Sequence, residues 1–117
     1  MQLFVFILNK TEKLEDLLAE FVRVGLKGAT VLSSTGMARV LMGHDDDLPL
    51  IGSLRSVLYP ERAKNNTIFT VLNDDQVECA VAAVERVVGD ICQKDTGIIF
   101  TVPISYTKGL EGACKIT

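Results

Sequence analysis

Apolar residues recur in the same order in the two ends of this chain. An apolar run, a segment of helical periodicity and a second apolar run occupy residues 2–33, and the same succession returns in residues 67–104. Short apolar runs are typical of buried strands, whereas apolar positions three and four apart indicate one face of a helix. The pattern predicts two β-α-β halves, separated by a segment of different character at residues 34–66.

The first half begins with a predicted strand, Leu3–Leu8, that is apolar at every position. Such a strand needs cover on both faces, which is typical of the centre of a sheet. Thr11 is the predicted N-cap of the helix that follows, Gly25 is predicted to end it, and the next strand is predicted at residues 29–33. The predicted buried stripe of this helix is Leu14, Leu17, Leu18, Phe21 and Val22.

The second half repeats this order with different residue types. The β-branched and aromatic run Thr67–Leu72 predicts a strand, and Asn73 with Gln76 three residues later resembles a capping box at the start of a helix. Gly89 is predicted to end this helix, and the last strand is predicted at residues 97–102. Its predicted buried stripe is Val77, Ala80, Val81, Val84, Val87 and Val88.

Together these elements predict one α+β domain over residues 1–117 with an insert at residues 37–66. The order matches the ferredoxin-like βαββαβ arrangement, an antiparallel sheet with two helices on one face. Because the first strand alternates apolar side chains toward both faces, the face without helices should also be apolar. Soluble monomers rarely expose apolar patches above roughly a few hundred Å². We therefore expect an oligomer interface there; the alternative is that residues 34–66 fold back over this face.

The insert has its own pattern. Apolar residues at helical spacing predict a short amphipathic helix at residues 48–59, which follows Asp47 and is stopped by Pro60. His44 and the three aspartates after it are candidate ligands of a hard cation. Consecutive residues of an extended chain point in alternating directions, however, so a solvated acidic turn is the expected structure. The stripe of the predicted helix is Leu50, Ile51, Leu54, Val57 and Leu58.

Composition narrows the possible functions. The chain is 48% hydrophobic but contains no apolar stretch of about 18 residues, so no membrane insertion is expected. The N-terminal apolar run has no cation before it and is expected to be a strand and not a targeting signal. A net charge of -3 argues against a nucleic-acid partner. Cys79, Cys92 and Cys114 fit no disulfide or zinc pattern, which favours reduced thiols in the cytoplasm.

Four segments resemble, in order and spacing, the nitrogen-regulatory P-II family of signalling proteins. They are VGLKGATV at residues 24–31, GMAR at 36–39, NDDQV at 73–77 and TGIIFTV at 96–102. The resemblance implies a ferredoxin-like homotrimer whose sheets face inward. It also implies that a small effector, with an adenine nucleotide as the candidate, binds in clefts between subunits. A protein partner is then contacted through residues 37–66.

The resemblance also implies ligand-binding positions, and the chain departs from the family at some of them. Val40 stands where the family has a glutamine that helps to bind 2-oxoglutarate with magnesium and ATP, and Ile98 stands where a phosphate-binding lysine is expected. Effector binding is therefore expected to be weaker than in typical P-II proteins and independent of 2-oxoglutarate. The positions that the resemblance assigns to ligand binding are Gly36, Arg39, Lys64, Gly97 and Lys108.

Two other function classes share the predicted fold. A divalent-cation-binding trimer similar to the copper-tolerance CutA family would use His44 and Asp45–Asp47 as ligands. A small enzyme such as an acylphosphatase needs a phosphate-binding loop with a positioned arginine, which the loop after the first strand does not supply. The chain has one histidine and no paired base and nucleophile, so neither catalytic residues nor enzymatic activity is expected.

Overall fold

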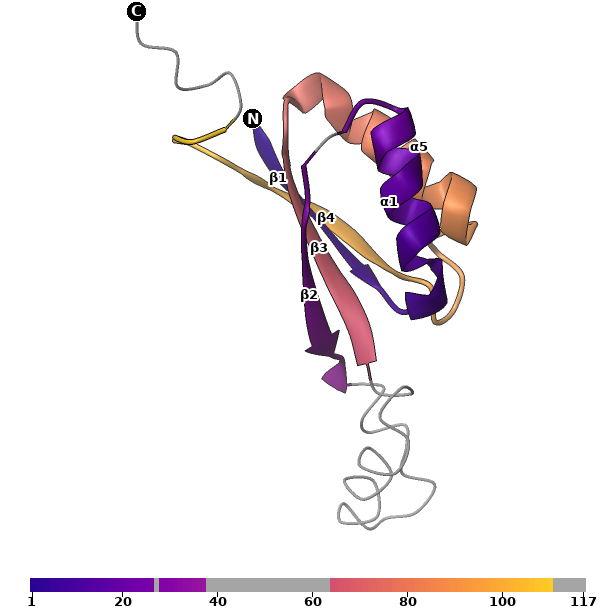
Figure 1. The fold of residues 1–117 in the computed structure, drawn as a ribbon. Coiled ribbons are helices and arrows are strands. Elements are labelled where there is room, and N and C mark those ends of the chain that lie inside the picture. The colour runs from indigo at the N-terminus through magenta and orange to yellow at the C-terminus, as the bar shows by residue number, and fades with distance from the viewer. Residues whose placement is uncertain (27, 38–63, 111–117) are drawn as a thin grey trace, which may run out of the picture.

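The computed structural model describes residues 1–26, 28–37 and 64–110 (Figure 1). Their strands form one antiparallel sheet in the order β2-β3-β1-β4. Helices α1 and α5 lie together on one face of that sheet (Figure 1). This small α+β arrangement is compatible with the predicted ferredoxin-like fold. The elements are β1 (Gln2–Leu8), η1 (Thr11–Lys13), α1 (Leu14–Arg23), β2 (Thr30–Thr35), β3 (Lys64–Leu72), η2 (Asp74–Gln76), α5 (Val77–Val88) and β4 (Gly97–Pro103).

The hairpin of β2 and β3 is longer than the apolar pattern indicates. Ser34 pairs with Asn65 and Thr35 with Lys64, so three residues assigned to the insert, 64–66, belong to β3 instead. These added residues are polar, and hydrophobic periodicity does not register them. The predicted helix at residues 48–59 and the acidic turn at His44–Asp47 lie outside the described residues.

The start of the first helix differs from the prediction, whereas its end agrees with it. Thr11 lies inside the 3-10 turn η1, and α1 begins only at Leu14. At the other end Gly25 has φ of 90° and its N–H donates to Val22 O, while Leu26 N–H donates to Phe21 O. These two bonds form a Schellman motif, in which glycine adopts the left-handed conformation at no steric cost.

The capping box predicted at Asn73 is present, and it begins the 3-10 turn η2 that leads into α5 at Val77. The backbone N–H of Asn73 donates to Gln76 Oε1 at 2.8 Å, and the Asn73 side chain accepts in return, which completes the capping box. Gly89, with φ of 84°, follows the last helical residue of α5. Local chemistry therefore sets both ends of this helix.

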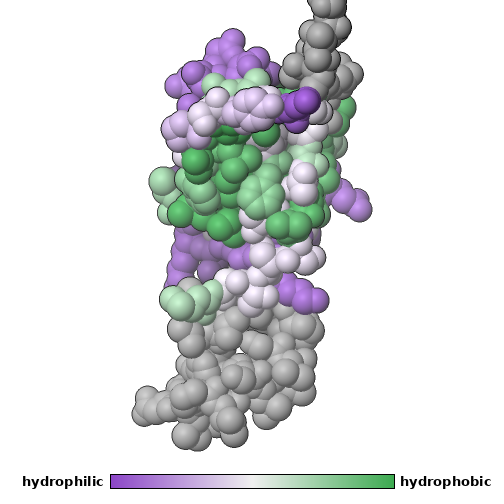
Figure 2. Space-filling model, turned by 90° about the vertical axis from the view of Figure 1, so that its left-hand side faces the viewer, coloured by the Kyte–Doolittle hydropathy of each residue, from purple (hydrophilic) through white to green (hydrophobic). Residues whose placement is uncertain are grey.

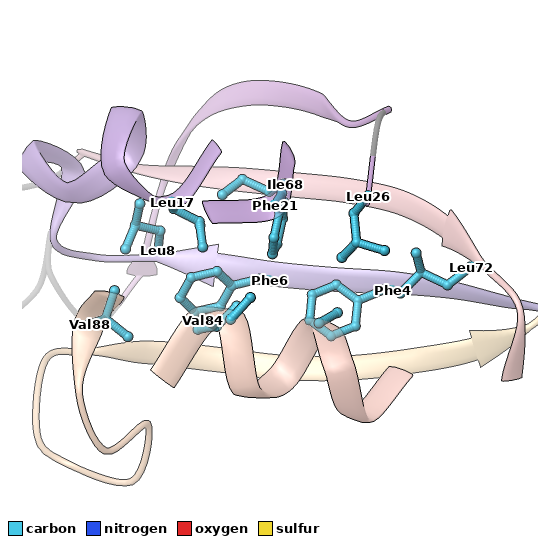
Figure 3. Packing of buried hydrophobic residues seen from close by; sticks show 12 residues of the cluster. Phe4, Phe6, Leu8, Leu17, Phe21, Leu26, Ile68, Leu72, Val84 and Val88 are labelled. Atoms are coloured by element: carbon cyan, nitrogen blue, oxygen red, sulfur yellow. The ribbon is translucent and has the colours of Figure 1, made fainter. Parts of the chain in front are cut away.

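The core lies between the sheet and the two helices (Figure 3). Phe4 and Phe6 of β1 are fully buried, and the Phe4 ring meets Phe21 of α1 edge-to-face with centroids 6.5 Å apart. Val22 was expected in the buried stripe of α1, but its side chain is 67% exposed because it lies one position around the helix from Phe21. The buried core residues are Phe4, Phe6, Leu8, Leu17, Phe21, Leu26, Ile68, Leu72, Ala80, Ala83, Val84 and Val88.

One ion network joins the outer sides of the two helices. The Glu20 carboxylate accepts hydrogen bonds from Arg23 Nε at 2.9 Å within α1 and from Arg86 Nε of α5 at 2.7 Å. These two guanidinium groups lower the pKa of Glu20 to about 2.

Within the described part of the chain, neither helix has the length and apolar character that crossing a bilayer requires.

Candidate functional site

The face of the sheet opposite the helices, here called the helix-free face, is apolar across its middle. The β1 residues Leu3, Val5 and Ile7 point to it, because their neighbours Phe4, Phe6 and Leu8 point into the core. Residues that lie opposite these three on the neighbouring strands β3 and β4 share the same face and form rows across the sheet. The rows are Val71–Leu3–Val102, Phe69–Val5–Phe100 and Thr67–Ile7–Ile98, with Leu32 of β2 beyond Thr67.

Much of this apolar surface is open. Ile98 and Phe100 of the edge strand β4 are 54% and 44% exposed, and Leu32 on the opposite edge is exposed as well. Figure 2 shows this side of the molecule, with hydrophobic residues gathered over the middle of its described part. No element of the described residues covers these side chains. The prediction of an apolar face without helices is therefore met by the positions of the residues.

A groove of about 850 Å³ borders one end of the helix-free face. It lies where α1 turns into β2 and where β3 ends, and Leu3, Thr30, Phe69 and Val71 belong both to it and to the face. The groove therefore opens at the margin of the apolar surface. Its lining residues are Met1, Leu3, Gly25, Leu26, Gly28, Ala29, Thr30, Phe69, Thr70, Val71, Leu72, Asn73, Gln76 and Leu110.

Apart from the Met1 ammonium group, which is paired with Asp74, the polar groups of the groove are neutral side chains and backbone. The Thr70 hydroxyl is already used, because it donates to Gly28 O at 2.5 Å. At the rim, Asp74 accepts from the Met1 amine at 3.0 Å and from the Gln2 amide, which lowers the pKa of its carboxyl group. None of the described lining residues has an ionisable side chain. The groove thus suits the uncharged, partly apolar portion of a ligand.

The predicted ligand-binding positions separate into two groups. Gly36 follows β2 and Lys64 begins β3, so they lie side by side, since Thr35 pairs with Lys64. Gly97 begins β4 opposite Leu8, at the same end of the sheet. Lys108 lies at the other end, near the groove: Met1 and Leu110 line the groove, and the Thr107 hydroxyl is 3.6 Å from Met1 Sδ. Arg39 lies outside the described residues.

Gly97 has a packing role that the resemblance does not indicate. Its φ is 151°, and a Cβ atom there would collide with the backbone carbonyl of Ile7 and lie 2.7 Å from Phe6 Cε1. A side chain at this position would push β4 away from β1. The glycine is therefore explained by the close approach of two strands.

The groove is the feature that sequence reasoning missed. The sequence feature that marks the groove is the pair Gly25 and Gly28 between α1 and β2. The sequence pattern assigned these glycines only to the end of a helix and the start of a strand. A cavity depends on side chains from elements that are distant in sequence, and periodicity carries no information about it.

In residues 1–26, 28–37 and 64–110 no three histidine, cysteine or acidic side chains gather as metal ligands. The cation ligands of the alternative function, His44 and Asp45–Asp47, lie outside those ranges and stay a prediction.

No protein-family model matches the chain, and the search of curated proteins likewise returned no match. The likeness to P-II proteins consequently rests on the four sequence segments alone.

Proposed function

We propose that this chain is a cytoplasmic, non-enzymatic regulator of the P-II type, a ferredoxin-like homotrimer that binds a small effector between its subunits. The observation that carries the proposal is the position of the groove at the margin of the helix-free face. Copies packed through that face would turn the groove into a cleft between subunits, which is a natural place for a ligand.

The apolar side chains of the face favour association of copies. Burying a large apolar side chain contributes about 1.5–3 kcal/mol relative to leaving it in water. Ile98, Phe100 and Val102 form an exposed apolar row on one edge strand, next to the half-buried Leu3 and Ile7 of β1. Another copy of the chain can bury these three side chains of β4 without leaving a charge unpaired, because none of them is charged.

The split between the candidate residues also favours a site made by two subunits. β1 has seven residues, so the two ends of the sheet are roughly 20 Å apart at about 3.3 Å per residue. Lys64 lies at one end, and Lys108 with the groove lies at the other. An adenine nucleotide would place its base in the uncharged groove of one subunit and its phosphates toward a lysine of the next. Regulation of a partner would then act through residues 37–66, beside Gly36 and Lys64.

The oligomer is tested by light scattering coupled to size exclusion. We expect a trimer for the unmodified chain and monomers for Phe100→Glu, because association would bury an unpaired charge at a cost of about 3–5 kcal/mol. Val22→Glu is the matched control: Val22 is exposed on the helix side, so this variant should stay trimeric. A monodisperse monomer of the unmodified chain at micromolar concentration would refute the trimer.

The effector is tested separately by calorimetry with ATP, ADP and AMP. We expect at least one nucleotide to bind, without tightening by magnesium and 2-oxoglutarate. Ala29→Trp should abolish binding by filling the groove, whereas Ala82→Trp on the exposed side of α5 should not. No binding of any nucleotide to a trimeric sample would reject this effector class and leave the oligomer standing. Submicromolar ATP affinity that tightens with 2-oxoglutarate would contradict the expectation drawn from Val40 and Ile98.

A further inference from the structure

A small polar network lies on the helix-free face at the end of the sheet nearest the insert. Asn65 is only 5% exposed, and its amide oxygen accepts a hydrogen bond from the Ser34 hydroxyl at 2.5 Å. The Thr67 hydroxyl lies 2.7 Å from Ser34 Oγ and donates to it, since the single Ser34 proton is already used. The Asn65 amide nitrogen reaches Asn9 Oδ1, just after β1, at 3.5 Å. The network thus joins three neighbouring segments of the sheet.

The apolar pattern of β2 sets its register on β3 only weakly. β2 reads Thr-Val-Leu-Ser-Ser-Thr, and Val31 is its one residue that packs against the described core cluster. The connection of β2 to β3 is 28 residues long, over residues 36–63, so it is not the tight turn that fixes the register of a short hairpin. A shift by one residue would turn Val31 out of the core. A shift by two residues would keep every side chain of β2 on the same face of the sheet. The alternation of apolar and polar residues therefore does not rule out this register, and another feature must do so.

Asn65 supplies that explanation. In the observed register Ser34 lies opposite Asn65. After a shift by two residues, the residue opposite Asn65 is Leu32 or Gly36, and neither has a hydrogen-bonding side chain. The buried amide oxygen would lose the hydroxyl group of β2 that donates to it, an unfavourable change for a buried polar group. Of these registers, only the observed one places a β2 hydroxyl group opposite Asn65.

The second polar contact between these segments does not discriminate in this way. The Thr70 hydroxyl donates to the backbone carbonyl of Gly28. Backbone carbonyls recur at every residue, so a hydroxyl group can find an acceptor in a shifted register as well. The hydroxyl group of β2 that donates to Asn65, by contrast, belongs to one residue, Ser34.

We infer that Asn65, through Ser34, selects the register of β2 on β3 and so determines that Gly36 and Lys64 lie side by side at the base of the insert. A single buried asparagine that specifies the register of a coiled coil is the helical parallel. Asn65 is a positioning residue in this proposal. The inference does not depend on the proposed effector.

The test is nuclear magnetic resonance of the full chain, which reads register from contacts between Hα atoms of facing residues. Replacing both partners by apolar side chains, Asn65→Leu with Ser34→Val, removes the hydrogen bond between them. We expect a second set of cross-strand contacts displaced by two residues and amide exchange in β2 about tenfold faster, with the pairing of β1 and β4 unchanged. The wild-type contacts alone, with unchanged exchange, would overturn the proposal.

Three further variants separate register from stability. Ser34→Ala is the milder substitution if the double variant does not fold, and it should show the same second register at lower population. Ser34→Thr keeps the hydroxyl and should restore the single wild-type register. Thr70→Val should lose stability and keep that register; a shifted register in Thr70→Val would show that Asn65 is not the selecting residue.

Discussion

The two faces of the sheet are built from the same apolar residue types but are completed differently. On one face Phe4 and Phe6 meet α1 and α5 and are fully buried. On the other, Phe100 remains largely open and no described element lies over it. Apolar character alone therefore does not decide which face of the sheet is covered within one chain. The difference lies in whether the chain itself supplies a covering layer, and two helices are enough for only one face.

The two faces should stabilise the fold in different ways. Contacts of the helix-covered face form within one chain and stabilise it at any concentration. Contacts of the helix-free face, if copies supply them, stabilise the fold by mass action and depend on protein concentration.

Phe6→Ala should lower the free energy of unfolding by about 3–5 kcal/mol, because it leaves a cavity in the helix-covered core. Phe100→Ala in dilute protein should lower it by less than about 1 kcal/mol, since this side chain is already 44% exposed in one subunit. Urea unfolding at low micromolar concentration measures both. Equal losses of unfolding free energy in the two variants would mean that Phe6 and Phe100 are equally well packed within one chain.

Gly97→Ala should lower the free energy of unfolding by about 2–4 kcal/mol, since its Cβ would collide with the Ile7 carbonyl and the backbone is in a conformation that disfavours side chains. Gly28→Ala is the control, because a Cβ there meets nothing within 4 Å and its φ is not in the left-handed region. The control should change stability by no more than about 1 kcal/mol. Thermal unfolding compares the two, and an unaffected Gly97 variant would show that β4 moves away from β1 at little cost.

The unfolding temperature of the unmodified chain should rise by a few degrees between micromolar and tenfold higher concentration, because association is linked to folding. Phe100→Glu should abolish this dependence, while Val22→Glu should retain it. Differential scanning calorimetry over a concentration series provides the measurement. A concentration-independent temperature for the unmodified chain would remove the energetic contrast between the faces.

Glu20→Gln should cause the smallest change, a slight loss of stability at neutral pH. The guanidinium groups of Arg23 and Arg86 lower the folded-state pKa of Glu20 to about 2 from its ordinary value of 4.5. A lowered folded-state pKa contributes stability above the unfolded value, which is lost as the pH falls through the folded one. The difference between wild type and variant should therefore shrink from pH 4.5 to pH 2. Urea unfolding across this range checks it, and a difference that persists at pH 2 would assign the effect to packing.

Local signals in the sequence predicted much of the fold. The alternation in β1, the stripe of α5, the capping box at Asn73 and the glycine that ends α1 each depend on residues within a few positions of one another. Such signals are readable because strand and helix periods and capping bonds are short-range. The separation of Lys108 from Lys64 was not readable, since it follows from how the strands lie in the sheet.

The sequence by itself determined that both faces of the sheet are apolar and where most of its helices and strands lie. The tertiary structure decided which set of alternating side chains packs against the helices: Phe4 and Phe6 do, whereas Val5 lies on the helix-free face. It also decided that β3 begins at Lys64, where Asn65 finds Ser34. The reason is physical: periodicity states that two faces exist, but which face is covered, and which polar residues meet, depends on the side on which the helices pack and on the register of strands far apart in the chain.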